Sequence, residues 1–326
     1  MKKIFTLISA VAIAFSVAAC GSTNTTTNTT TEEKKETITI TSLNGNKEKI
    51  DLEVPLNPER VAVLDMASLD ILDNLGVGDK VVGTASTSLD YLQEYIDNEN
   101  VKNIGTIKEA DLEAVMAVEP DVIFIGGRLA SVYDKLSEIA PVVYLSVDTE
   151  LGVYESTKQN LETIAKMFEK ENEASEKMDS LKARIDKLAE FAKGKTAIVG
   201  LATSGSYNLL SNDGRCSLIG REIGFENVGQ GLNDDATSTH GNETSFELVS
   251  KLNPDYMFVL DRDAAISKEG AQLAKDIVEN ELVKQTDTYK NGHIVYLANP
   301  SVWYTAEGGV TALDYMLQDL ESELLK

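Results

Sequence analysis

Two segments of the sequence share one pattern, LEAVMAVEPDVIFI at residues 112–125 and FELVSKLNPDYMFVL at residues 246–260. Each begins as a short helix, passes through Pro-Asp and ends in an uninterrupted apolar run. The spacing from the glutamate (Glu113 or Glu247) to the proline is the same in both. An apolar run without polar alternation, next to a helix, is typical of a parallel strand that is buried on both faces. The repeated unit therefore predicts an α/β fold with two related lobes.

Strand-like and helix-like runs alternate on both sides of this repeat, as expected for Rossmann-like lobes with mostly parallel sheets. Between the two halves, residues 154–193 carry apolar side chains at helical spacing among many charges, and no proline interrupts them. This predicts one long helix that bridges the lobes, with residues 170–172 as the place where it could break. A cleft between two such lobes is a usual place for a small ligand.

The first twenty residues have the pattern of a bacterial export signal. Lys2 and Lys3 precede an apolar run that is too short for a good transmembrane helix, and small residues lead to Cys20. The sequence VAAC at residues 17–20 resembles the lipobox of bacterial lipoproteins. The resemblance implies cleavage before Cys20 and a diacylglyceryl group on its sulfur, and two acyl chains can anchor a soluble domain stably. An ordinary secretory signal with an incidental cysteine is the alternative.

The composition changes after this signal and divides the chain into five segments. Residues 21–36 are rich in Ser, Thr and Asn and lack apolar side chains, so they cannot pack a core. The predicted boundaries are 1–19 for the signal peptide, 20–36 for the lipidated cysteine and a flexible tether, 37–153 for the N-terminal lobe, 154–193 for the bridging helical segment and 194–326 for the C-terminal lobe.

Composition and motifs exclude several functions. The chain has 326 residues and a formal net charge of −23, from 53 acidic against 30 basic residues, which argues against a general nucleic-acid binder. Two histidines and two cysteines are too few for a His/Cys-rich zinc site. No Gly-x-Ser-x-Gly motif occurs, and Gly194-Lys195-Thr196 lacks the earlier glycine of a phosphate-binding loop. The sequence therefore predicts a binding protein and not an enzyme.

Three arginines stand at places where a ligand could bind. Arg128 and Arg262 follow apolar strand-like runs, and Arg215 begins a predicted helix. Ligands of open α/β sheets bind beyond the carboxyl ends of the strands. Arginine suits a delocalised aromatic anion because it donates in a planar fork and stacks on π-faces. His240, in a polar loop, and Tyr304, just past a predicted strand, add an imidazole and a phenol that are both plausible iron ligands.

Four motifs carry a resemblance to a known family: STHG at residues 238–241, NPDY at 253–256, LDR at 260–262 and VWY at 302–304. With them the chain, from about Thr37 to Leu325, resembles the ferric-catecholate siderophore-binding lipoproteins of bacterial ABC importers, in the class III periplasmic-binding-protein group. The resemblance implies two α/β lobes bridged by one long helix, with a ligand cleft between the lobes and small hinge motion.

The resemblance also implies a binding site, partners and a location. It implies a ferric catecholate siderophore as ligand and no permanently bound cofactor. It further implies a monomer, anchored through Cys20 on the extracytoplasmic face of the cell membrane, that delivers the ligand to an ABC permease. The family's pocket arginines match Arg128, Arg215 and Arg262, its iron ligands match His240 and Tyr304, and its permease-docking glutamates match Glu113 and Glu247. Trp303, in the VWY motif, is a further predicted ligand-binding residue.

Glu307 departs from the family pattern, which usually has small residues at this place. A carboxylate close to an anionic ligand would weaken binding unless it points away from the ligand or pairs with an arginine. Three alternatives stay open for the function. They are a binding protein of the same fold for haem, a corrinoid or a hydroxamate siderophore, a divalent-metal binding lipoprotein, and a lipid-anchored enzyme.

Overall fold

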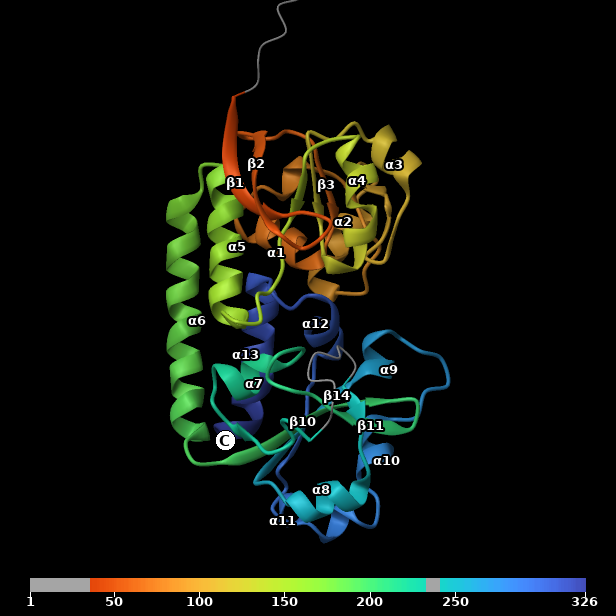
Figure 1. Ribbon diagram of the computed structural model, residues 1–326, viewed down its shortest axis with the longest axis vertical. Helices are drawn as coiled ribbons and strands as arrows, with labels where there is room; N and C mark the ends of the chain where they lie inside the picture. Colours follow the sequence, from red (N-terminus) through yellow and green to blue (C-terminus); the bar gives the residue numbers. More distant parts are fainter. Residues whose placement is uncertain (1–35, 233–240) are drawn as a thin grey trace, which may run out of the picture. The chain divides into compact units, whose positions relative to one another are not determined.

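The computed structural model describes residues 36–232 and 241–326, and these residues belong to one compact unit (Figure 1). The predicted signal peptide, Cys20, most of the predicted tether and His240 lie outside the described residues. Two large sheets with connecting helices make up the described chain, which confirms the α/β fold class. Within the described part of the chain, no helix is both long enough and apolar enough to cross a lipid bilayer.

The first large sheet is entirely parallel and has the strand order β5-β4-β3-β8-β9. Its strands β3 (Val61–Leu64) and β8 (Val122–Ile125) are buried at every residue, which explains why their sequences show no polar alternation. The other elements of this lobe are β1 (Thr37–Leu43), β2 (Lys49–Pro55), β4 (Val81–Thr84), β5 (Lys102–Asn103), β6 (Gly105–Thr106), β7 (Glu109–Ala110), β9 (Val142–Tyr144), α1 (Met66–Asn74), α2 (Gln93–Asp97), α3 (Leu112–Ala117), α4 (Tyr133–Ser137) and the 3-10 helices η1 (Gly78–Lys80), η2 (Asp90–Leu92) and η3 (Gly127–Val132).

The second large sheet is mixed and has the strand order β13-β11-β10-β14-β15, with β12 paired to β10. Strands β10 (Thr196–Thr203), β14 (Tyr256–Asp261) and β15 (Ile294–Tyr296) are parallel, whereas β11 (Ser206–Leu209) forms an antiparallel hairpin with β10. The other elements of this lobe are β12 (Glu226–Asn227), β13 (Asn242–Glu243), α7 (Ser217–Arg221), α8 (Phe246–Leu252), α9 (Arg262–Ala265), α10 (Ala274–Val278), α11 (Asp287–Lys290), α12 (Pro300–Thr305) and the 3-10 helix η4 (Val283–Gln285).

The repeated Pro-Asp has the same structural role in both lobes. Asp121, before β8, accepts hydrogen bonds from the backbone N–H groups of Glu59 (2.9 Å) and Arg60 (3.0 Å), just before β3 begins. Asp255, before β14, accepts a hydrogen bond from the backbone N–H of Thr196 (2.8 Å), where β10 begins. Since β8 pairs with β3 and β14 pairs with β10, each carboxylate fixes the start of a neighbouring parallel strand. The sequence repeat is therefore also a structural repeat.

The connector between the lobes is helical, but it consists of two helices rather than one. Helix α5 (Val153–Met167) and helix α6 (Glu171–Ala192) pack side by side (Figure 1). The break falls close to the place that the sequence allowed: Glu169 adopts a left-handed conformation (φ 54°), and the backbone N–H of Lys170 donates back to the carbonyl of Ala165 (2.8 Å). This closes α5 and turns the chain into α6, which leads directly to β10.

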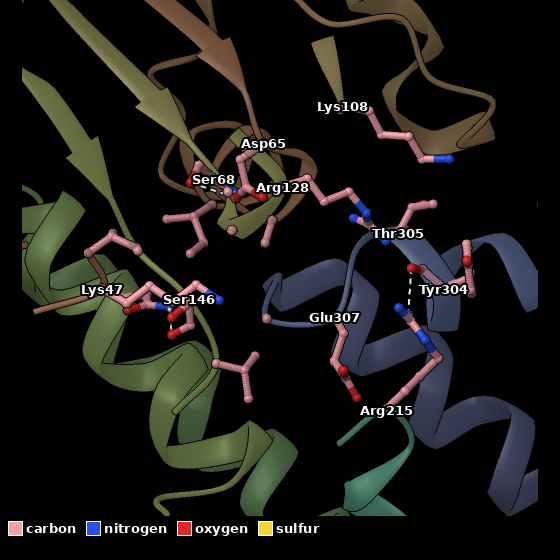
Figure 2. A pocket seen from close by; sticks show the side chains of 18 of the residues that line it. Lys47, Asp65, Ser68, Lys108, Arg128, Ser146, Arg215, Tyr304, Thr305 and Glu307 are labelled. Carbon is pink, nitrogen blue, oxygen red and sulfur yellow. Dashed lines mark hydrogen bonds between the residues drawn. The ribbon is translucent and has the colours of Figure 1, made fainter. Parts of the chain in front are cut away.

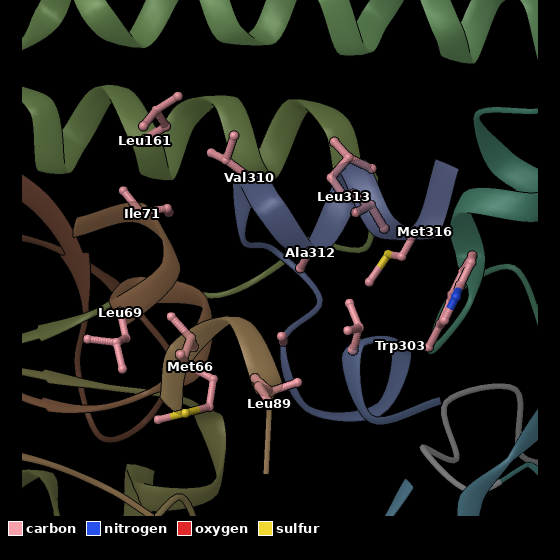
Figure 3. Packing of buried hydrophobic residues seen from close by; sticks show 14 of the residues in the cluster. Met66, Leu69, Ile71, Leu89, Leu161, Trp303, Val310, Ala312, Leu313 and Met316 are labelled. Carbon is pink, nitrogen blue, oxygen red and sulfur yellow. The ribbon is translucent and has the colours of Figure 1, made fainter. Parts of the chain in front are cut away.

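The last helix, α13 (Val310–Leu324), packs against α1, α5 and α6, so its first turn contacts the first lobe while the end of the chain lies beside the second lobe (Figure 1). Its first turn is held by Asp70 of α1, a buried side chain. The Asp70 carboxylate accepts hydrogen bonds from the backbone N–H groups of Thr311 (2.9 Å) and Ala312 (2.8 Å). Figure 3 shows Ile71 and Trp303 in the same hydrophobic cluster as side chains of α13. One hydrophobic cluster therefore extends across both lobes, and the second lobe has a further cluster of its own on the other face of its sheet strands.

Candidate ligand-binding site

A cavity of about 460 Å³ is lined by loops and helices from both lobes (Figure 2). Much of its wall follows the carboxyl ends of parallel strands: Asp65 comes after β3, Arg128 after β8, Ser146 after β9 and Arg262 after β14. This is the edge at which open α/β sheets bind ligands. The position of the cavity therefore agrees with the cleft that the sequence predicted.

The three predicted arginines converge on Tyr304. The Cζ atoms of Arg215, Arg262 and Arg128 lie 4.1, 5.7 and 5.9 Å from the centroid of the Tyr304 ring. The Nε of Arg262 also donates a hydrogen bond to the Tyr304 hydroxyl (3.1 Å). Arg128 comes from one lobe and the other two arginines from the other lobe, so the structure brings together residues that are far apart in the sequence.

These arginines repel one another. Arg128 is exposed at the cavity, yet its pKa is lowered, first by partial loss of hydration and next by the positive charge of Arg215. The carboxyl group of Asp65 partly compensates the charge of Arg128; it accepts a hydrogen bond from the backbone N–H of Ser68 (2.9 Å) and caps α1. Burial raises the pKa of Asp65, while the Ser68 hydrogen bonds and Arg128 oppose this rise. An anion in the cavity would relieve the repulsion between the guanidinium groups.

Hydrogen bonds to protein groups fix two of the arginines. Arg215 donates to the carbonyl oxygens of Tyr304 (2.6 Å) and Trp303 (3.2 Å), at the end of α12, where a helix favours a positive charge. Arg262 donates to the hydroxyl of Thr203 (3.2 Å), and that hydroxyl donates to the carboxylate of Asp263 (2.8 Å). Because the Thr203 hydroxyl donates its proton to Asp263, the lone pairs of the Thr203 oxygen can accept the hydrogen bond from Arg262. The two guanidinium groups are therefore held in place before any ligand arrives.

The two glycines before Arg128 are required by close contacts. A Cβ atom on Gly126 would lie 2.5 Å from an oxygen of Asp65, and a Cβ atom on Gly127 would lie 3.1 Å from the Tyr144 hydroxyl. Larger residues would push the loop away from α1. The Gly-Gly pair thus allows β8 to end close enough to α1 for Arg128 to line the cavity.

Glu307 also lines the cavity, and its carboxyl group is shielded. Its Oε1 atom has no hydrogen-bond partner among the described residues. Burial raises the pKa of Glu307 to about 7, although the charge of Arg215 and the backbone N–H of Cys216 lower it. The Cys216 thiol is itself buried, and burial raises its pKa, which makes it a core side chain.

Two lysines in the cavity wall are absent from the sequence prediction. Lys47 lies in the turn between β1 and β2 with a left-handed backbone (φ 64°), and Lys108 lies in the turn between β6 and β7. Both side chains are exposed. A lysine in a polar turn looks like any surface lysine in the sequence. Only the packing of the two hairpins beside the cavity shows that these two lysines line it.

Trp303 requires a correction. The sequence predicted that it contacts the ligand, but its side chain is completely buried and does not line the cavity. Its indole N–H donates to the carboxylate of Asp319 on α13 (2.9 Å). Trp303 and Tyr304 lie on α12, where neighbouring side chains point in different directions, so only Tyr304 faces the arginines.

The predicted docking glutamates occupy equivalent positions on the two lobes. Glu113 and Glu247 are both exposed in the first turn of their helices, α3 and α8. Arg128 follows Glu113 at the same sequence separation as Arg262 follows Glu247, so the repeat includes the cavity arginines as well. The described residues contain no group of three or more His, Cys, Asp or Glu side chains that could hold a metal ion.

Comparisons with known proteins identify the family of this chain. Residues 61–300 match the periplasmic binding protein family. The chain is 35% identical to the petrobactin-binding protein YclQ of Bacillus subtilis (strain 168) over the full length of both chains. The crystal structure of YclQ superposes with a TM-score of 0.82 at 34% identity, covering 90% of this chain and 100% of YclQ.

Two further relatives extend the comparison. The structure of the periplasmic catecholate-siderophore binding protein VctP of Vibrio cholerae has a TM-score of 0.78 at 29% identity, covering 87% of this chain and 100% of VctP. The Fe(3+)-citrate-binding protein YfmC of Bacillus subtilis (strain 168) is 30% identical over 77% of this chain and 76% of its own length. The relatives are binding proteins and not enzymes, as the sequence predicted for this chain. The chain therefore belongs to the periplasmic binding protein family.

Proposed function

We propose that this protein is the extracytoplasmic binding protein of an ABC importer and that it captures a ferric catecholate siderophore in the cavity. The observation that carries the proposal is the convergence of Arg128, Arg215 and Arg262 on Tyr304, in a chain with a net charge of −23. A local cationic wall can hold an anion against the acidic background. The broader part, an iron–siderophore binding protein, rests on the family and on the ligands named for its relatives.

Charge matching supports a catecholate as the ligand. A ferric tris-catecholate carries three negative charges, and three guanidinium groups can neutralise them in a partly desolvated cavity. At an effective dielectric constant of 20, each close pair contributes about 4 kcal/mol before desolvation is subtracted. The planar guanidinium groups also suit the flat, delocalised catecholate rings, on which they can stack. The mutual repulsion of Arg128 and Arg215 adds to the affinity, because the ligand removes it.

Tyr304 and His240 extend the proposal to ligands with fewer catechols. A siderophore that supplies only two catechols leaves two coordination positions open on iron. The Tyr304 ring already lies among the three arginines, and Arg262 donates a hydrogen bond to its oxygen. We propose that Tyr304 and His240 complete the coordination of iron in such complexes.

The location and the partners are part of the same proposal. The diacylglyceryl group on Cys20 anchors the protein to the extracytoplasmic face of the membrane, and the protein acts as a monomer. Glu113 and Glu247 dock on the permease. Their exposure in equivalent helices of the two lobes supports this assignment, because a two-lobed binding protein then offers one acidic contact from each lobe.

Replacing the three arginines tests the proposal. The variant Arg128→Gln, Arg215→Gln, Arg262→Gln should bind a ferric tris-catecholate at least about a hundredfold more weakly than the wild type, because the cavity loses three positive charges but keeps polar side chains. Quenching of intrinsic fluorescence measures the affinity. A matched control with the same change in net charge replaces the exposed Lys251, Lys284 and Lys290 by Gln, and it should bind normally.

The same assay distinguishes the ligand classes. The wild type is titrated with ferric complexes of catecholate, hydroxamate and citrate type, with haem, with a corrinoid and with Zn²⁺ and Mn²⁺ alone. Tightest binding of a ferric catecholate supports the proposal. Tightest binding of another ligand in this panel, or unchanged affinity in the triple arginine variant, contradicts it.

A further inference from the structure

Glu307 is an acidic side chain in the wall of a cavity that otherwise suits anions. It lies in the loop between α12 and α13, and Figure 2 shows its carboxyl group on the Arg215 side of the cavity, pointing away from Arg128. Its Oε1 atom is shielded from solvent and has no hydrogen-bond partner in the described part of the chain. A buried oxygen without a hydrogen bond makes the ionised form of the carboxyl group unfavourable. The charge state of Glu307 is therefore sensitive to what occupies the cavity.

The groups around Glu307 shift its pKa in opposite directions. Burial is the largest influence and favours the neutral carboxyl group, and Glu222 acts in the same direction. Arg215 and the backbone N–H of Cys216 favour the carboxylate. The balance is a pKa of about 7, so that both forms are populated at neutral pH. The other charged or titratable side chains that line the cavity are Lys47, Asp65, Lys108, Arg128, Arg262 and Tyr304.

An anionic ligand changes this balance. A ferric tris-catecholate would bring three negative charges into the cavity that Glu307 lines, and negative charge disfavours ionisation of a neighbouring carboxyl group. Because protonation and ligand binding are linked equilibria, a ligand that favours the neutral form of Glu307 also binds more tightly to the protein in which Glu307 is neutral. We propose that binding of the ferric complex is coupled to proton uptake by Glu307, and that the cavity loses affinity as this group ionises. This inference rests on the proposed function and adds control of the same site by pH.

The coupling has a measurable size. Near pH 7.5, binding should take up about half a proton or more per complex, because the unliganded group is mostly ionised there and the liganded group is mostly neutral. The dissociation constant should rise about tenfold between pH 6.5 and pH 8.5. The preformed ferric complex is used for both measurements, so that its coordinating oxygens have already lost their protons.

Isothermal titration calorimetry tests the inference. The protein is titrated with the iron(III) complex of a synthetic hexadentate tris-catecholamide, in two buffers of different ionisation enthalpy near pH 7.5, which gives the number of protons taken up. The variant Glu307→Gln keeps the size and polarity of the side chain but cannot titrate. It should take up no proton at this position and should show at most about a twofold change in dissociation constant over the same pH range. Glu307→Ser is a second variant with the same expected result, should Glu307→Gln fail to fold.

Glu94→Gln is the matched control, because Glu94 is a glutamate with a raised pKa that lies on α2 and does not line the cavity. It should keep the proton uptake of the wild type. Both histidines remain in every variant, so their protons cancel in the comparison. Wild-type binding without proton uptake, or uptake that survives in the Glu307 variants, overturns the inference and leaves the proposed function intact. No binding of the ferric complex at any pH overturns the proposed function instead.

Discussion

At the scale of single residues, Tyr304 is the centre of the site. Three guanidinium groups surround its ring, and its hydroxyl accepts a hydrogen bond from Arg262. The residue is almost completely buried, with 4% of its surface exposed, so the hydroxyl has few possible partners. A phenol in such surroundings can serve as a hydrogen-bonding group towards a complete ferric complex or as an iron ligand towards an incomplete one.

The double variant Tyr304→Phe with His240→Ala distinguishes these two roles. Affinity for a ferric complex with two catechols should fall at least about tenfold, because iron loses two protein ligands, whereas affinity for a three-catechol complex should change about twofold or less. Fluorescence quenching and the visible charge-transfer band measure both. Tyr289→Phe with His293→Ala, outside the cavity, is the matched control. Equal losses for the two kinds of ligand would remove direct coordination from the proposal.

The sequence could predict some residues of the site but not others, for physical reasons. Arg128 and Arg262 could be found because each follows an apolar strand, and such strands end at the ligand-binding edge. Trp303 was misassigned because the sequence indicated no helix at residues 300–305, and a helix separates the directions of adjacent side chains. Lys47 and Lys108 carry no local signal, because tertiary packing alone places their turns at the cavity.

At the scale of elements, the first turn of α13 joins the two lobes. Asp70 of α1 accepts hydrogen bonds from two backbone N–H groups of this turn and from the hydroxyl of Tyr91 (3.0 Å). The helix–strand alternation and the amphipathic pattern of α13 could be predicted from the sequence. The Asp70 contact could not, because it connects residues from opposite ends of the chain, and a buried aspartate in a helix shows no partner in the sequence.

Removing the Asp70 contact should destabilise the protein. Asp70→Ala leaves buried backbone N–H groups of α13 without an acceptor, and we expect the free energy of unfolding to fall by about 2 kcal/mol. Urea unfolding followed by circular dichroism measures the change. Asp73→Ala, in the same helix, is the control, because the Asp73 side chain interacts with the side chains of Tyr95 and Glu94 and caps no helix, so this variant should lose less stability. Equal stability of Asp70→Ala and the wild type would show that α13 needs no such cap.

At the scale of the whole molecule, the proposed function requires two separate surfaces, the cavity for the ligand and the pair of exposed glutamates for the permease. The double variant Glu113→Lys, Glu247→Lys should bind the ferric complex with unchanged affinity, because neither residue lines the cavity. Uptake of radioactive iron as the siderophore complex, by cells that depend on this protein, should fall at least about tenfold through loss of two charge pairs with the permease. Glu99→Lys with Glu281→Lys, two other exposed glutamates, makes the same charge change and should leave uptake intact. Normal uptake by Glu113→Lys, Glu247→Lys would contradict the docking assignment.

The repeat that joins Glu113 to Arg128 and Glu247 to Arg262 has a mechanical consequence. If Glu113 and Glu247 dock on the permease as proposed, one helix–strand unit in each lobe, α3–β8 or α8–β14, leads from the docking residue to the cavity arginine. A permease that binds both glutamates would then respond to the distance between the two lobes. It would thereby detect whether the ligand is bound, without contacting the iron.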